Sequence, residues 1–222
     1  KEMLRDVLLG IDNKDNVIIA TTFSSHLARL KSIIEFGQKL NRKIIFLGRS
    51  LAKYTHAGEK AGIIDFSKKI EIVKYSKQIR KRLNKIEEDR GKYLLVVTGH
   101  QGEHNSVLYK IARGELKFKL KPEDNMIFSC TTIPTPTNIA NREALENELK
   151  LSGIRIFKDI HQSGHAAKED LRDFINLIKP KNIIPAHGNK EMKNALVDLA
   201  VEMGYKADKN VFLVKDGHKI SL

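Results

Sequence analysis

The chain has 222 residues, of which 41% are hydrophobic, enough for one large domain or one and a half small ones. Its 40 Lys and Arg against 27 Asp and Glu give a net charge of +13. That excess favours a polyanionic partner such as nucleic acid, although a merely lysine-rich soluble surface is the alternative. A single cysteine, Cys130, excludes an internal disulfide framework and is expected in the core.

No apolar stretch approaches the length of a membrane span, and no signal peptide opens the sequence. We therefore expect no membrane partner and a cytoplasmic location.

Short apolar runs alternate with segments of helical periodicity along the chain. The runs are residues 17–20, 44–47, 94–97, 126–128, 154–157, 183–184 and 211–214. Unbroken apolar strands separated by helices are typical of a parallel sheet that is covered on both faces. The sequence therefore predicts an α/β fold.

Three of the predicted strands end in polar residues and glycine. Residues 21–25 read Thr-Thr-Phe-Ser-Ser, residues 98–103 read Thr-Gly-His-Gln-Gly-Glu, and residues 131–134 read Thr-Thr-Ile-Pro. Ligands of open α/β sheets bind outside the carboxyl ends of the strands. Hydroxyls, glycines and helix N-termini at that edge would suit a phosphate backbone. Ordinary helix caps and turns are the alternative.

Two charged segments have simpler explanations. Residues 77–92 mix seven cations with three acidic residues at helical spacing, which is typical of a solvated helix face. Residues 117–121 alternate Lys with apolar residues like an edge strand that has one wet face, which could also contact phosphate.

Residues 100–104 match the H-x-x-E-H pattern of a class of zinc proteases. That chemistry needs both histidines on one face of a helix. Here a strand ends at Gly99, and Gly102 interrupts the turn, so we expect His100 in a loop and Glu103 in the first helical turn. The pattern therefore disfavours a protease. A Rossmann-like nucleotide-binding domain is disfavoured too, because no G-x-G-x-x-G follows the first strand.

Histidines beside glycine follow two predicted strands in the last third of the chain. Residues 161–165 read His-Gln-Ser-Gly-His, and residues 185–188 read Pro-Ala-His-Gly. A neutral imidazole there could bind a metal, and a charged one could give a proton to a leaving oxygen. His26 and His56 stand alone in helical segments and are interpreted as structural or surface residues.

Taken in order, residues 98–103, Ile133-Pro134, residues 161–165 and residues 185–188 resemble the motifs of β-CASP metallo-β-lactamase nucleases. The resemblance is to RNase J, in particular its archaeal branch, and residues 21–25 and 48–50 extend it. It implies a Rossmann-like parallel-sheet β-CASP domain over residues 1–157. Residues 158–222 would then be the last strands and helices of a metallo-β-lactamase fold.

The resemblance also implies roles for single residues. Glu103 would be an acidic residue at the active-site cleft, His165 a general acid or proton shuttle, and His187 a zinc ligand. Substrate-binding residues would be Thr98, Gly99, His100, Gly102, His161, Ser163 and Gly164. His100 departs from the serine that many bacterial members have at this position.

Such nucleases cleave RNA with two zinc ions, through a bridging hydroxide that attacks phosphorus. Most zinc ligands belong to a His-x-His-x-Asp-His cluster that precedes the β-CASP insert, and this sequence contains no such cluster. The chain is therefore expected to start where that insert starts. The complete enzyme would act on single-stranded RNA as a 5′-to-3′ exonuclease, an endonuclease or both, and it could form a homodimer. This chain alone would bind RNA without cutting it, and a non-catalytic RNA-binding module is the alternative.

Overall fold

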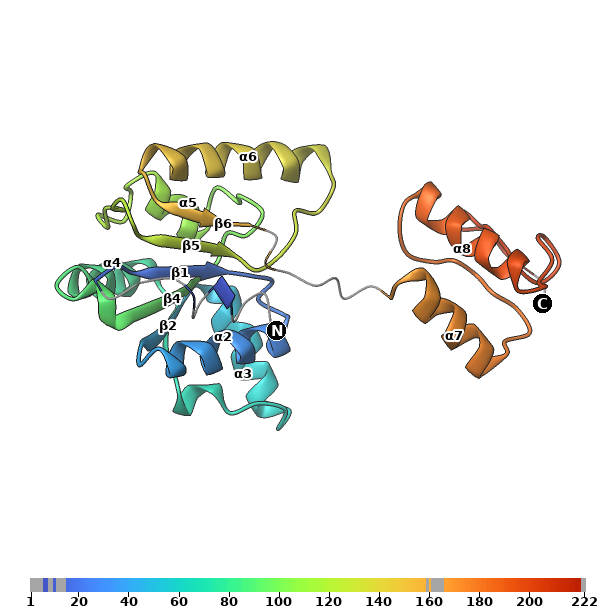
Figure 1. Ribbon diagram of the computed structural model, residues 1–222, viewed down its shortest axis with the longest axis horizontal. Helices are drawn as coiled ribbons and strands as arrows, with labels where there is room; N and C mark the ends of the chain where they lie inside the picture. Colours follow the sequence, from blue (N-terminus) through green and yellow to red (C-terminus); the bar gives the residue numbers. More distant parts are fainter. Residues whose placement is uncertain (1–5, 8–9, 11–14, 159, 161–165, 221–222) are drawn as a thin grey trace. The chain divides into compact units, whose positions relative to one another are not determined.

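The computed structural model describes residues 6–7, 10, 15–158, 160 and 166–220 (Figure 1). They fall into two compact units, residues 1–162 and residues 163–222, and each is described by itself.

The first unit contains a six-stranded sheet in which every strand pairs in parallel with its neighbours. The strands are β1 (Ile18–Thr21), β2 (Lys43–Leu47), β3 (Glu71–Val73), β4 (Tyr93–Val97), β5 (Asn125–Phe128) and β6 (Arg155–Phe157). Their order across the sheet is β3-β2-β4-β1-β5-β6. The predicted α/β fold class is confirmed.

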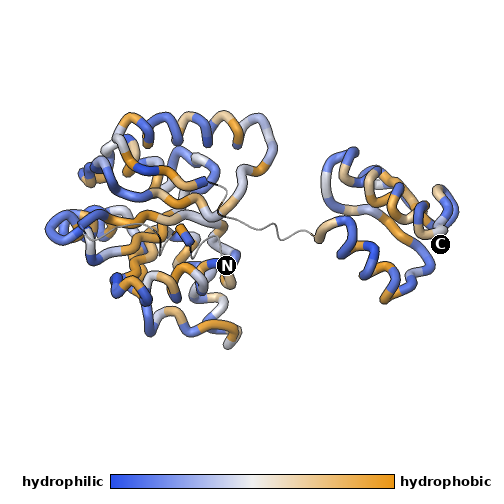
Figure 2. The backbone as a smooth tube through the Cα atoms, in the orientation of Figure 1, coloured by the Kyte–Doolittle hydropathy of each residue, from blue (hydrophilic) through white to orange (hydrophobic). Residues whose placement is uncertain are grey.

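Helices cover both faces of this sheet. They are α2 (Leu27–Lys39), α3 (Arg49–Lys60), α4 (Ser76–Ile86), α5 (Val107–Ala112) and α6 (Pro136–Leu151), with short 3-10 turns at Phe66–Lys68 and Arg90–Lys92. Apolar side chains of α2 and α3 pack on one face of the sheet, and those of α4, α5 and α6 pack on the other (Figure 1). The strands between them are coloured as hydrophobic in Figure 2, as expected for strands buried on both sides.

The second unit pairs α7 (Lys168–Ile178) with α8 (Lys190–Glu202). Its small core contains Ile175, Ile183, Leu199, Ala200 and Val211. The predicted strands at residues 183–184 and 211–214 are wrong as strands, because only isolated bridges at Ile183 and Val211 form. Pro185, which has no amide hydrogen to donate, follows directly and limits the pairing.

The edge strand predicted at residues 117–121 is also wrong. Its alternation does correspond to burial, since Leu116, Phe118 and Leu120 are buried between exposed lysines. However, Lys117 has a φ of +55° and its amide donates to the Gly114 carbonyl, so the segment starts with a turn.

Within the described residues, no helix combines the length and the apolar composition that crossing a bilayer would require.

Candidate functional site

A crevice lies at the carboxyl edge of the sheet, between two neighbouring strands whose following helices lie on opposite faces. From β2 the chain runs to α3 on one face, and from the adjacent β4 it runs to α5 on the other face. Loops that diverge in this way leave a space between them, which is where open α/β sheets bind ligands. Gly48 and Thr98 meet at this point, since a Cβ added to Gly48 would lie 2.5 Å from the Thr98 methyl carbon.

The loop of residues 98–103 starts at this crevice. The Thr98 amide donates to the Leu47 carbonyl at 3.3 Å, and the Thr98 hydroxyl accepts from the Val107 amide at 3.3 Å. Gly99 has a φ of +123°, and a Cβ there would lie 2.4 Å from Ser106 Oγ. The loop therefore packs against the start of α5 so closely that only glycine fits at residue 99.

Glu103 lies before α5 and not in its first turn, which corrects the sequence prediction. The helix begins at Val107, and the Ser106 hydroxyl caps it by accepting from the Tyr109 amide at 3.2 Å. Since Ser106 provides the cap, the Glu103 carboxylate is not needed for it. Its Oε2 accepts from the Gln101 amide at 2.9 Å, and its Oε1 lies 3.6 Å from Nδ1 of His100.

His100 packs into the protein and does not line the pocket beside the loop. Its ring meets Phe23 edge-on at 4.3 Å, and its Nε2 atom has no hydrogen-bond partner among the described residues. Burial lowers the pKa of His100, and the charge of Arg142 lowers it further, against the opposing effect of Glu103. Residues 100–104 form turns and no helix, so the arrangement that an H-x-x-E-H protease needs is absent from this segment.

Gln101 connects this loop to the loop that follows β5. Its side-chain amide donates to the Thr131 carbonyl at 3.1 Å and accepts from the Ile133 amide at 2.8 Å. Both the donor and the acceptor of one side chain are thus used between two loops. The Gln101 side chain is buried, so these bonds are shielded from competing water.

Helix α6 holds the same loop from the other side. The guanidinium of Arg142 donates to the His100 carbonyl at 2.7 Å and to Glu146 at 2.9 Å, and it lies 3.4 Å from the centre of the Phe128 ring. Gly102 has a φ of +79°, and a Cβ there would lie 2.2 Å from the Asn141 carbonyl oxygen. Gly102 therefore packs directly on the helix backbone.

The hydroxyls of Thr21 and Thr22, at the end of β1, are used inside the fold, which differs from the prediction that they face a ligand. Thr21 donates to the Val97 carbonyl at 2.8 Å, Thr22 donates to the Ser129 carbonyl at 2.9 Å, and Ser129 donates to the Ile160 carbonyl at 2.8 Å. All three residues are buried. These hydroxyls join strand ends, while Thr131 is exposed.

A pocket of about 770 Å³ lies beside the loop, at the ends of β2, β3 and β4. Of the residues predicted from sequence, Thr98, Gly99 and Glu103 line it, whereas His100 and Gly102 do not. Sequence reasoning missed the remaining polar lining, which includes Arg49, Lys53, Lys74, Tyr75 and Lys110. Of these five residues, only Arg49 stands in a sequence motif that could have indicated the site, the Gly-Arg-Ser segment that follows the second strand.

Of the residues predicted in the last third, the structure describes only His187. His187 is exposed and is followed by Gly188 with a φ of +110°. His161, Ser163, Gly164 and His165 lie outside the described residues. In the part of the chain that the structure describes, no three His, Cys, Asp or Glu side chains come close enough to hold a metal ion. The described residues therefore do not form a zinc centre by themselves.

Two protein-family models match the sequence of this chain. Residues 14–147 match the family model described as "Ribonuclease J, beta-CASP domain", and residues 154–214 match "Zn-dependent metallo-hydrolase RNA specificity domain".

Two curated archaeal proteins named Ribonuclease J are similar along essentially the whole chain. The protein of Pyrococcus abyssi is 42% identical over 222 residues, and that of Methanocaldococcus jannaschii is 40% identical over 220 residues. These alignments cover 100% and 99% of this chain and 49% of each relative. A Ribonuclease J of Mycoplasma pneumoniae is 34% identical over 92% of the chain and 35% of its own length.

The chain thus spans about half the length of the archaeal relatives that it matches. Since the first family model covers more than half of the chain, and the second follows it in the predicted order, the chain belongs to the Ribonuclease J family.

Proposed function

We propose that the protein to which this chain belongs is an RNA-degrading or RNA-processing nuclease that hydrolyses phosphodiester bonds, and that this chain binds the RNA and supplies part of the active site. The observation that carries the proposal is the ordered match to both domains, together with two relatives named Ribonuclease J that align over the chain. The charge of +13 supports a polyanionic substrate. Attack from the 5′ end, internal cleavage or both would be compatible with the site.

The proposed domains follow the sequence motifs. Residues 1–157 would form the β-CASP domain, and residues 158–222 would form the C-terminal part of the metallo-β-lactamase domain. The two compact units, residues 1–162 and 163–222, support a division in this region.

Several residues of this chain would act on the RNA. The loop of residues 98–103 would contact the substrate at the carboxyl edge of the sheet, with Glu103 exposed toward the pocket. His165 would give a proton to the leaving oxygen, and His161, Ser163 and Gly164 would bind the phosphate. His187 would supply one zinc ligand.

Two zinc ions are proposed for the complete enzyme, where they would polarise the phosphate and supply a hydroxide nucleophile. The described residues provide no group of three ligands for either ion. A second candidate for the chain by itself is a non-catalytic RNA-binding module, which the charge of +13 supports. A cytoplasmic location and a homodimer of the complete enzyme are also proposed.

Binding and cleavage by the purified 222-residue chain test the proposal. We expect weak binding of single-stranded RNA, with an affinity that falls steeply as salt rises, because phosphate contacts release counterions. We expect no cleavage. The control is the His165→Ala chain, assayed with and without chelator to identify contaminating ribonuclease.

The outcomes separate the two candidates. Cleavage that needs metal and disappears in the variant would show that the chain holds a working metal centre after all. Absence of any salt-dependent RNA binding would contradict both candidates.

A further inference from the structure

We propose that the pocket at the ends of β2, β3 and β4 binds one or two nucleotides of single-stranded RNA, with Tyr75 stacking on a base while Arg49 and Lys53 bind phosphate. The inference rests on the proposed function, because it assigns a place and a chemistry to RNA binding. A volume of about 770 Å³ is within the usual range of small-ligand pockets.

The charge of the pocket fits phosphate. Four cationic side chains line it, namely Arg49, Lys53, Lys74 and Lys110, and Glu103 is the single carboxylate among the described lining residues. Arg49, Lys53 and Lys110 form no ion pair with any described residue. Arg49 and Lys53 are also exposed, so both can reach an incoming anion. Unpaired cations that converge on one cavity raise its affinity for polyanions.

The backbone of two helices adds to this preference. Helices α3 and α4 both begin at the pocket, with Gly48 and Tyr75 as their N-cap residues. Neither residue makes a side-chain cap, and neither helix has an acidic residue in its first turn. Amide groups and the positive end of the helix dipole are therefore available for an anion at both helix starts.

The exposed ring of Tyr75 favours a nucleotide over a bare anion as the occupant of the pocket. It lines the pocket, and 54% of its surface is exposed although it is a large aromatic residue. The Lys74 ammonium lies over its ring, 5.1 Å from the centre, so a cation already contacts one face of this exposed ring. Aromatic rings next to cations are the usual means by which proteins bind single-stranded nucleic acid, since unpaired bases can stack on them.

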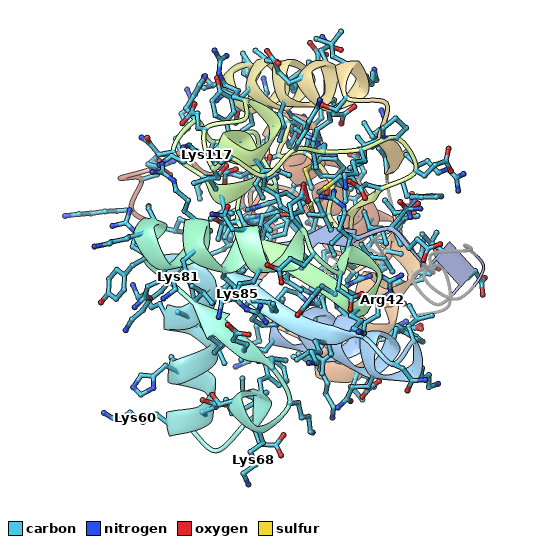
Figure 3. The ribbon with its side chains drawn as sticks, turned by 90° about the vertical axis from the view of Figure 1, so that its left-hand side faces the viewer. Arg42, Lys60, Lys68, Lys81, Lys85 and Lys117 are labelled. Carbon is cyan, nitrogen blue, oxygen red and sulfur yellow. The ribbon has the colours of Figure 1, made fainter. Side chains whose placement is uncertain are left out.

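Other exposed lysines of this unit are arranged differently. Figure 3 shows Lys60, Lys68, Lys81, Lys85 and Lys117 spread over one side, and none of them lines the pocket. Lys60 and Lys85 stand in the last turns of α3 and α4, where a cation stabilises the helix C-terminus. They are suitable charge controls, and the exposed Tyr54 of α3, which lies outside the pocket lining, is the aromatic control.

The test is fluorescence anisotropy of labelled oligouridylate with the 222-residue chain and its variants. Tyr75→Ala should weaken binding of the single strand roughly tenfold, the usual effect of losing one stacked base. A hairpin duplex with the same number of phosphates should bind this variant within about twofold of the wild type, because its bases are already paired. Tyr54→Ala should match the wild type on both RNAs.

A double change of charge tests the phosphate contacts. Arg49→Ala with Lys53→Ala should weaken binding of both RNAs, and it should lower the salt slope by roughly 0.7 for each single-strand phosphate that is no longer neutralised. Lys60→Ala with Lys85→Ala removes the same charge outside the pocket and should lower affinity less than twofold. Photocrosslinking of wild-type chain to 4-thiouridine RNA, followed by peptide mass spectrometry, should label the segment around Tyr75.

The results distinguish this inference from the function on which it rests. A wild-type chain that binds no RNA would overturn both. Normal wild-type binding that Tyr75→Ala and the double variant weaken no more than their controls, with no crosslink near Tyr75, would overturn the pocket assignment alone. Circular dichroism melts verify folding, and the crosslink decides the question even if a variant is unstable.

Discussion

Arg142 of helix α6 donates a hydrogen bond to the carbonyl oxygen of His100, which lies 42 residues earlier in the chain, at 2.7 Å. The same guanidinium packs on Phe128 and pairs with Glu146, and the Arg142 residue is only 4% exposed. One buried cation thus joins the sheet, a helix and the loop that carries Glu103. We infer that Arg142 is a positioning residue for this loop, since it holds the backbone and does not line the pocket.

Arg142→Ala should lower the free energy of unfolding by about 2–4 kcal/mol, because a buried carbonyl and Glu146 lose a charged partner. The Lys158 ammonium, 3.0 Å from the Glu146 carboxylate, would still offset part of the Glu146 charge in this variant. Urea denaturation followed by circular dichroism measures the change. The control is Arg113→Ala, whose half-exposed ion pairs with Glu115 and Glu148 should contribute less than about 1 kcal/mol. Equal losses in the two variants would remove Arg142 from this role.

Gly102→Ala should destabilise the chain more than an alanine at an unobstructed glycine. Both Gly102 and Gly62 have positive φ, +79° and +70°, but a Cβ at Gly62 meets no atom within 4 Å. Gly62→Ala should therefore cost about 1 kcal/mol from the backbone conformation alone. Gly102→Ala adds a contact of 2.2 Å with the Asn141 carbonyl and should cost about 3 kcal/mol or more. Thermal denaturation of both variants checks this, and similar melting temperatures would argue against close packing of the loop on α6.

His100 should make stability depend on pH in the mildly acidic range. Burial lowers its pKa in the folded chain, so the unfolded chain binds more protons as pH falls below the ordinary value of about 6.5. The free energy of unfolding should fall from that pH downward until the lowered pKa is reached, and it should be insensitive to this group well above 6.5.

A His100→Ser variant lacks this titration. The melting temperature of the wild type should therefore decline more than that of the variant between pH 7.5 and pH 5. His56→Ser, at an exposed position of α3, is the matched control and should decline like the wild type. Parallel curves for wild type and His100→Ser would show that His100 is not buried in the neutral form.

His187→Ala in the complete enzyme should lower zinc content and abolish cleavage, because a zinc site tolerates loss of a ligand poorly. Elemental mass spectrometry measures zinc per chain. His56→Ala removes an exposed imidazole elsewhere and should leave zinc and activity unchanged. If His187→Ala retains both full zinc and full activity, His187 is not a ligand.

His165→Ala in the complete enzyme should slow the chemical step by roughly 10²–10⁴, the usual contribution of a general acid, while RNA affinity falls far less. Single-turnover kinetics with saturating enzyme measure the step. A structural histidine would instead lower the melting temperature and the affinity together. That pattern, or an unfolded variant, would contradict the assignment.

The sequence by itself determined the fold class and the general place of the loops. Buried runs such as residues 17–20 and 94–97 are apolar at every position because parallel strands are covered on both faces, and this pattern is local. Gly99 and Gly102 were identifiable in the same way, since they stand in a polar segment directly after a strand. The motif order also indicated the family, which the comparisons confirmed.

Only the tertiary structure decided which side chains meet. The order β3-β2-β4 places Lys74 and Tyr75 near Thr98 in one pocket, although these residues stand more than 20 positions apart in the sequence. Tertiary contacts also place the ring of His100 against Phe23 and bring Arg142 to the loop. The hydroxyls of Thr21 and Thr22 donate to backbone carbonyls of neighbouring segments. Periodicity records whether a residue is buried, but its partner depends on contacts between distant segments, and those form only when the sheet assembles.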